Sequence, residues 1–312
     1  MTLRALLTLL SCCSALALVA AGCGGGDESG GDGGGLITAD GSSTVGPFTT
    51  KAAEDWKDHG GGDVTVGISG TGGGFERFCA GETDISNASR QIDEEEVALC
   101  EEDGIEYVEL QVATDALTNV VSTSNDWATC LTVEQLAKIW GPGSTLSNWS
   151  QVDPAFPDVP LSLYGPGTDS GTFDYFTDVI NGDEGASRTD FSASEDDNII
   201  VQGVAGSEGG LGYLGFSYFE ENQDTLKALE VDGGSGCVTP SVEAAQGGTY
   251  TPLARPLFMY VKLSSLTDNE SVSEFVSYTL ENAEAIATEA QFVPMSAEQI
   301  AEQQQKLDDA TS

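Results

Sequence analysis

A run of glycine and hydroxyl residues interrupts the middle of the sequence, in the segment YGPGTDSGTFDYF at 164–176. The first amides of a helix have no partner within their own chain, so a Gly-rich turn that leads into a helix can bind an anion through free N–H groups. The same arrangement also serves as an ordinary helix cap, with Asp169 or Ser170 capping a helix that begins near Thr172. Both interpretations fit this segment taken alone.

Three other turns repeat the same chemistry, in the segments DGSSTVGP, ISGTGGGFE and NASR. Each places Ser or Thr after an expected strand and before an expected helix. Ligands of open α/β sheets bind beyond the carboxyl ends of the strands, so four such turns can surround one anion. The recurrence favours anion binding over capping alone.

Several kinds of catalytic and cofactor site are excluded by the residues available. None of the turns ends in Gly-Lys-Ser/Thr, and none is a dinucleotide fingerprint with a carboxylate placed after it. A nucleophilic Ser170 would need a base, but the single histidine, His59, lies in a charged turn. No C-x-x-C pair occurs, so neither a metal nor a cofactor is expected. We predict a binding protein and not an enzyme, with a secreted phosphatase as the weaker alternative.

The charge balance is strongly acidic, with 11 Lys and Arg against 51 Asp and Glu and a net charge of −40. Such a surface repels nucleic acid, so no DNA or RNA partner is expected. Salt screens charges beyond about 8 Å, so distant carboxylates matter little at a buried site where local N–H and O–H donors dominate. The acidity therefore does not argue against an anion ligand.

The N-terminal segment MTLRALLTLLSCCSALALVAAGC is typical of an export signal, with one arginine, an apolar run and small residues before Cys23. We predict a lipoprotein signal peptide at 1–22, with Cys23 lipidated; the alternative is ordinary cleavage beside an incidental cysteine. Residues 23–35 are rich in glycine and predict a flexible linker. The protein is thus expected to be tethered to the outer face of a bacterial cell membrane.

Four cysteines remain beyond Cys23, and an even number in an exported protein argues for two disulfides with three possible pairings. Cys79 and Cys100 each lie near the end of an expected helix with a short excursion between them, which favours their pairing. Cys130 and Cys237 are then left to form the second bond.

Strands alternate with helices along the chain, which predicts an α/β fold with helices on both faces of the sheet. Expected strands include 64–68, 107–113, 117–122 and 211–218, and a proline-bracketed strand within 250–262 that carries the chain back to the first part. Expected helices include one from about Pro47 to Lys57, one from about Gly73, an amphipathic helix at 131–141, and two tail helices around 271–282 and 296–309.

The segments DGSSTVGP, SGTGGGFERFCAGETDISNASR, GPGTDSGTFDYF, GGLGYLGFSYF and PLARPLFMYV, in this order, resemble the PstS family of phosphate-binding components of bacterial ABC transporters. The resemblance runs from Leu36 to about Pro294. It implies a two-lobed periplasmic-binding-protein fold of type II-like form that closes on phosphate, with a hinge of two crossovers. It places lobe 1 in 36–112 and 255–312, and lobe 2 in 113–254.

The resemblance also implies a set of phosphate-binding residues. Matched position by position, they are Ser43, Thr44, Thr71, Ser89, Arg90, Ser170, Gly171 and Thr172, with Ser69 as a further contributor. The best-known branch has a carboxylate where this sequence has Ser89, and an arginine before the lobe 2 loop where this sequence has GPG. We expect Arg90 to replace that arginine from the opposite lobe, because a guanidinium fork fits phosphate oxygens.

The missing carboxylate matters for anion choice, because a protonated phosphate oxygen needs an acceptor that would repel fully deprotonated sulfate. Asp169 is the first candidate for this acceptor and Asp40 the second; alternatively, Asp169 is a helix N-cap and nothing more. The resemblance implies a monomeric receptor that hands inorganic phosphate to ABC permease subunits. A phosphate sensor or wall-associated binding protein of the same fold is the alternative.

Overall fold

A computed structural model describes residues 35–168 and 170–312. The predicted signal peptide at 1–22, the lipidation site Cys23 and all but the last residue of the linker at 23–35 lie outside the described residues, as does Asp169. No helix within the described part of the chain is long and apolar enough to cross a membrane.

The N-terminal part of the fold is a parallel strand–helix unit. Strands β1 (Ile37–Gly41), β2 (Val64–Val66) and β3 (Ile85–Ala88) pair in parallel with β1 in the middle. Helices α1 (Gly46–Asp58), α2 (Gly70–Cys79) and α3 (Glu94–Glu102) connect and follow them. The expected helix from Pro47 is confirmed, whereas α2 begins at Gly70, earlier than predicted, and Gly70 adopts the positive φ that glycine permits.

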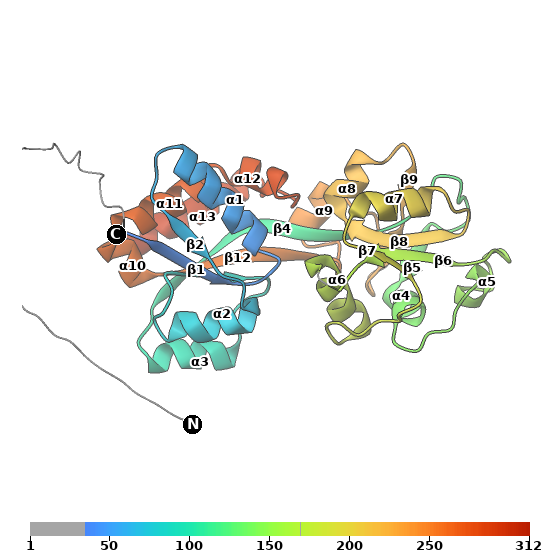
Figure 1. The fold of residues 1–312 in the computed structure, drawn as a ribbon, viewed down its shortest axis with the longest axis horizontal. Coiled ribbons are helices and arrows are strands. Elements are labelled where there is room, and N and C mark those ends of the chain that lie inside the picture. Colours follow the sequence, from blue (N-terminus) through green and yellow to red (C-terminus); the bar gives the residue numbers. More distant parts are fainter. Residues whose placement is uncertain (1–34, 169) are drawn as a thin grey trace, which may run out of the picture. The chain divides into compact units, whose positions relative to one another are not determined.

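Two long antiparallel strands, β4 (Tyr107–Ser122) and β12 (Ala254–Lys262), run side by side through the middle of the sheet (Figure 1). The prediction of two strands at 107–113 and 117–122 was wrong, because β4 is one continuous strand of 16 residues. Its pairing with β12 extends across the gap that the sequence suggested, from Ala116 opposite Ala254 to Tyr107 opposite Lys262. These strands carry the chain out of the N-terminal part and back into it.

The remaining strands complete a nine-stranded sheet in the order β2-β1-β3-β12-β4-β8-β6-β7, with β9 also paired to β4. They are β6 (Ser162–Pro166), β7 (Ser192–Ser194), β8 (Gly210–Gly215) and β9 (Leu226–Ala228). A separate three-stranded sheet contains β5 (Cys130–Thr132), β10 (Glu230–Asp232) and β11 (Cys237–Val238). The expected strand at 211–218 stops early, because Phe216 begins a helix.

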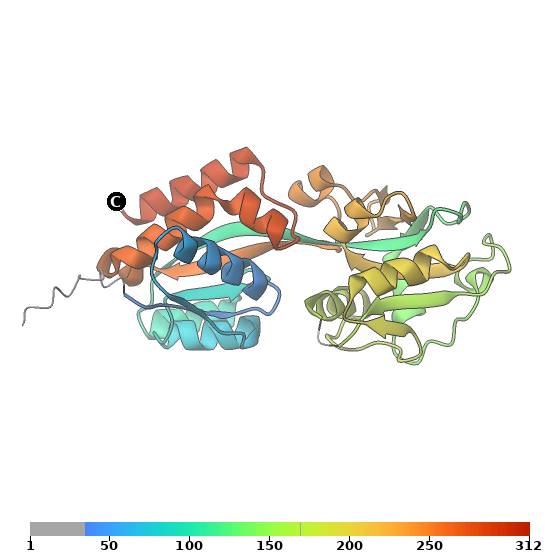
Figure 2. The ribbon, with the colours of Figure 1, turned by 45° about the horizontal axis from the view of Figure 1, so that its top comes forward.

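Helices cover both faces of the sheet, as the α/β prediction required. Near β1, helix α1 packs with α11 and α12 on one face, while α2 and α3 lie on the other (Figures 1 and 2). The remaining helices are α4 (Val133–Trp140), α5 (Trp149–Val152), α6 (Gly171–Phe176) with the π-helical segment η1 (Thr177–Asn181), α7 (Asp197–Ala205), α8 (Phe216–Glu221), α9 (Val242–Gln246), α10 (Leu263–Asp268), α11 (Glu270–Glu281), α12 (Ala283–Glu289) and α13 (Ala297–Ala310).

The buried apolar residues form two large, separate cores. One contains residues up to Ala113 and from Leu257 onward, and the other contains residues from Leu117 to Leu253. The change from one core to the other therefore occurs along both β4 and β12. This division agrees with two crossovers between lobes, and the lobe boundaries at 112/113 and 254/255 stay a prediction.

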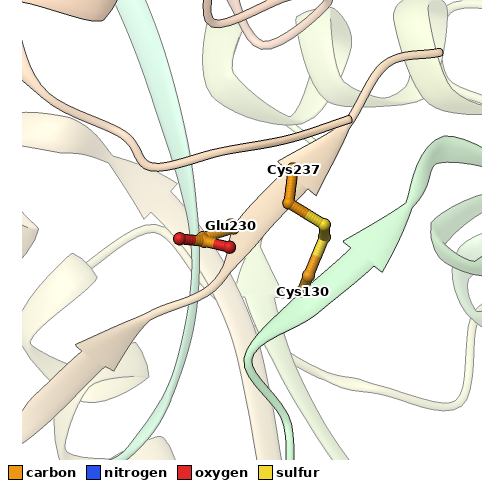
Figure 3. A group of neighbouring side chains, drawn as sticks. All are labelled: Cys130, Glu230 and Cys237. Atoms are coloured by element: carbon orange, nitrogen blue, oxygen red, sulfur yellow. A yellow bond between two sulfur atoms is a disulfide. The ribbon is translucent and has the colours of Figure 1, made fainter. Parts of the chain in front are cut away.

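Both predicted disulfides are present. Cys79–Cys100 joins α2 to α3 with 4.3 Å between the Cα atoms, and Cys130–Cys237 joins β5 to β11 with a Cα–Cα distance of 6.1 Å (Figure 3). The ligand-type atoms of Cys130, Cys237 and Glu230 lie within 4.8 Å of one another, but both sulfurs are used in the disulfide. The cluster therefore lacks the thiolates that would make it a zinc site.

Candidate anion-binding site

The turn after β1 presents two of the predicted residues to a cavity. Ser42 anchors the turn: its N–H donates to Asn87 O, and its Oγ accepts from Thr44 N at 3.2 Å. Ser43 and Thr44 line a cavity of about 210 Å³, and α1 begins beside it. The amide of Gly46, the first residue of α1, donates to Ser42 O at 2.9 Å, and the next residue, Pro47, has no N–H, so Ser43 and Thr44 serve the cavity through the turn and not through a free helix end.

The turn before α6 forms the facing wall of this cavity. Ser170 is the N-cap of α6, and its Oγ accepts from Thr172 N at 3.2 Å. Its hydroxyl proton is donated to no partner within 35–168 and 170–312, so it can serve a ligand. Gly171 and Thr172 line the same cavity. A Cβ at Gly171 would lie 3.1 Å from Thr44 Oγ1, so the two turns approach closely and glycine permits this. The structure thus brings five of the predicted residues together.

Arg255, which the sequence analysis missed, lies where these turns meet. It belongs to β12, and its Nη2 donates to Thr44 Oγ1 at 2.9 Å. Its Nε donates to Asp115 Oδ2 at 3.3 Å, and its Cζ lies 3.7 Å from the centre of the Tyr175 ring. The sequence contained one signal for this residue: it stands between two prolines in a strand predicted to return the chain to the first lobe.

Asp115 is a second residue that the sequence analysis missed. It lies on β4 directly opposite Arg255, it is 7% exposed, and it lines the cavity with Thr44. Burial raises the pKa of Asp115 above its ordinary value, although the Arg255 guanidinium acts to lower it. A carboxyl group is therefore held in the cavity wall beside a guanidinium, next to two hydroxyl-bearing turns.

Ser89 and Arg90 line a neighbouring, larger cavity of about 750 Å³ together with Arg255 and Tyr175. The two guanidinium Nη atoms of Arg90 donate to both carboxylate oxygens of Glu96 at 2.7 Å. Arg255 lines this larger cavity and also donates to Thr44, which lines the smaller one, so its guanidinium links the walls of the two cavities.

Thr71 supports the wall of the larger cavity. Its Oγ1 lies 3.1 Å from Ser89 Oγ and accepts a hydrogen bond from Ser89 N. Thr71 itself lines neither cavity, so the structure places it behind Ser89.

Asp40 and Ser69 occupy positions that support the turns and do not line either cavity. Asp40 Oδ1 accepts from Gly41 N at 2.7 Å and from Ser69 N at 3.0 Å, and Oδ2 is paired with Arg77. Burial acts to raise the pKa of Asp40, but these hydrogen bonds and the Arg77 charge lower it overall. With both oxygens engaged, Asp40 fastens the β2–α2 turn to β1. Asp169, the other acceptor candidate, lies outside the described residues.

The chain is similar to known proteins of one superfamily. Residues 26–283 match the PBP superfamily domain. Protein SphX of Synechocystis sp. is 49% identical over 265 residues, which cover 84% of this chain and 79% of the relative. The phosphate-binding protein PstS of Staphylococcus saprophyticus is 40% identical over 275 residues, which cover 88% of this chain and 84% of the relative.

A solved structure supports the same assignment. The possible phosphate binding protein from Planctomyces limnophilus is 45% identical and superposes with a TM-score of 0.84, covering 89% of this chain and 99% of that one. The chain therefore belongs to the PBP superfamily and, within it, to the phosphate-binding protein family that includes PstS and SphX. The expected periplasmic-binding-protein fold is confirmed.

Proposed function

We propose that this protein is an extracytoplasmic receptor that binds inorganic phosphate and delivers it to the permease subunits of an ABC transporter. The observation that carries the proposal is the Arg255 guanidinium, which contacts Thr44 and Asp115 at a cavity whose other wall is the α6 turn. The relatives named as phosphate-binding proteins support it. The receptor performs no chemistry.

The proposed ligand set joins the sequence-predicted residues to the two that the structure added. The cationic side chains are Arg255 and, after its release from Glu96, Arg90. The acceptor for a phosphate proton is Asp115. The hydroxyl and amide donors are Ser43, Thr44, Ser89, Ser170, Gly171 and Thr172. A hydrogen bond to a charged group is worth about 1.5–3 kcal/mol. Micromolar binding requires about 8 kcal/mol, so such a set is sufficient even after the cost of closure.

The same proposal includes a lipid anchor at Cys23, a monomeric receptor and a flexible 23–35 linker, all of which rest on the sequence. A sensor or wall-associated protein of the same fold would keep the site and lack the permease partner. A phosphatase using Ser170 is disfavoured because the single histidine, His59, contacts Asp55 O and Tyr278 OH and does not line the cavity.

Calorimetry of the protein with phosphate, sulfate, arsenate and molybdate tests the binding function. We expect a Kd for phosphate of micromolar or tighter and binding of sulfate at least about 100-fold weaker, because a carboxylate acceptor repels sulfate. Absence of phosphate binding, or a preference for sulfate, would refute the proposal. Phosphate uptake by cells that lack the protein but retain the permease separates the receptor from the sensor.

A carboxylate in the lining of the smaller cavity predicts a pH effect on affinity. Asp197, the first residue of α7, lines the smaller cavity, and burial together with Asp196 and Glu195 raises its pKa to about 6. Above this pH the ionised group repels the anion, and below it the repulsion is lost. Asp197→Asn should therefore tighten phosphate binding about twofold to fivefold at pH 7.5, and the gain should vanish near pH 5.

The measurement is the ratio of variant to wild-type Kd between pH 5 and pH 8, because the ratio cancels the ionisation of phosphate itself. The exposed Glu208, which does not line the cavity, supplies the matched control Glu208→Gln. A ratio for Asp197→Asn that does not change with pH would show that Asp197 exerts no charge effect on the anion.

A further inference from the structure

The ring of Tyr175 lies under the guanidinium of Arg255, on which the proposed site depends. Arg255 Cζ lies 3.7 Å from the centre of the Tyr175 ring, well within the range of a cation–π contact. Tyr175 is 4% exposed and belongs to α6, whose N-terminal turn contains Ser170, Gly171 and Thr172. One short helix therefore provides both the hydroxyl-bearing turn and the aromatic face behind Arg255.

The Tyr175 hydroxyl fixes the main chain that leads to the same arginine. Its OH donates to Pro252 O at 2.6 Å, and Pro252 lies two residues before β12 begins at Ala254. Burial raises the pKa of Tyr175, so the hydroxyl keeps its proton and remains a donor at neutral pH. Ring and hydroxyl together restrain both the Arg255 side chain and its strand.

The remaining contacts of Arg255 leave part of its fork free for a ligand. Nε donates to Asp115 and Nη2 donates to Thr44, whereas Nη1 makes no hydrogen bond with any residue in 35–168 or 170–312. By contrast, Arg90 donates through both Nη atoms to Glu96, and Arg188 is bonded to Asp190 and to backbone carbonyls. Within the described residues, Arg255 is thus held through Nε, through Nη2 and by the Tyr175 ring, and Nη1 is left for a ligand.

We propose that Tyr175 is a positioning residue for anion binding: its ring holds the plane of the Arg255 guanidinium so that the free N–H groups face an anion held at Thr44 and Ser170. The inference rests on the proposed function and adds a residue to it. Fixing the fork before binding removes an entropic cost that a free arginine side chain would incur. A purely structural role is the competing explanation, because Tyr175 also belongs to the hydrophobic core around Trp140 and Leu253.

A double-mutant cycle separates these explanations. The variants are Tyr175→Leu, Tyr175→Phe, Arg255→Met and the double variant Tyr175→Leu/Arg255→Met, with phosphate Kd measured by calorimetry, or by ³¹P NMR where binding is weak, and Tm measured as a check on folding. We expect Tyr175→Leu to weaken binding about tenfold or more, and Tyr175→Phe, which retains the ring, to stay within about threefold of wild type. The double variant should bind within about twofold of Arg255→Met.

Tyr175→Leu binding like wild type, or weakening binding equally with and without Arg255, would overturn the proposal. If wild type itself binds no phosphate, the proposed function and this inference fail together, and that outcome is distinct from the two above.

NMR of the wild-type protein tests the contact without any core substitution. The full sequence has five arginines, so the Nε–H signals of ¹⁵N-arginine-labelled protein are few, and Arg255→Lys assigns the one of interest. We expect the Arg255 signal to carry an upfield ring-current shift in the unliganded protein and to retain it at saturating phosphate while it moves on titration. If the Arg255 signal lacks this shift, or loses it at saturating phosphate, the guanidinium does not contact the anion while it lies on the Tyr175 ring, and the proposal is wrong.

Discussion

Replacing Arg255 with Met is expected to weaken phosphate binding by about 100-fold or more while the protein stays folded. The change removes a charge-assisted, forked donor and leaves the Asp115 carboxylate unpaired in the cavity, where it repels the anion. Truncating one partner of a desolvated charge pair costs about 2–5 kcal/mol, which corresponds to this range of affinity. Calorimetry with phosphate measures the effect, and Tm reports on the fold.

Three further variants show whether the loss reflects direct contact. Lys306 lines the larger cavity with Arg255, so Lys306→Met removes a cation nearby and should cost no more than about threefold. Arg255→Lys keeps the charge without the planar fork and should fall between wild type and Arg255→Met. Arg90→Met should cost less than Arg255→Met, because Glu96 already engages both Nη atoms of Arg90. Equal losses of phosphate affinity in Lys306→Met and Arg255→Met would mean that Arg255 acts only through its charge and not through direct contact with the anion.

Asp115→Asn is expected to lose most of the preference for phosphate over sulfate. A phosphate that retains a proton can donate to the Asp115 carboxylate, whereas sulfate meets it with repulsion, and an amide can donate to either anion. Asp115 is suited to this role because it is buried in the cavity wall next to Arg255 and Thr44. Sulfate binding should tighten by about 10-fold to 100-fold relative to phosphate.

Competition binding with the two anions gives this ratio directly, and the ratio is insensitive to a general change in affinity. Asp178 lines the adjoining cavity, so Asp178→Asn serves as the matched control. An unchanged ratio in Asp115→Asn would exclude Asp115 as the acceptor. Asp169→Asn in the same assay addresses the earlier hypothesis, and loss of discrimination there would assign the acceptor to Asp169.

Features that depend on neighbours along the chain could be predicted from the sequence alone. Glycine and hydroxyl residues at strand ends predicted the turns at Ser43 and Ser170, and the capping role of Ser170 followed from the same segment. Cys79 and Cys100 were paired because each lies near the end of a helix with a short excursion between them. Alternation of strands and helices sufficed for the α/β class because period and turn chemistry are local properties.

The contacts within the candidate site depend on pairing between distant strands and could not be predicted in this way. Arg255 and Asp115 are 140 residues apart and meet only because β12 and β4 pair in a register that sets them directly opposite each other. The same pairing makes β4 continuous where the sequence predicted a break. The sequence predicted Asp40 and Arg90 as candidate ligands of the anion. In the structure Arg77 of α2 pairs with Asp40, and Glu96 of α3 accepts from Arg90. The interaction between two charges depends on their distance in space, which a local sequence pattern does not show.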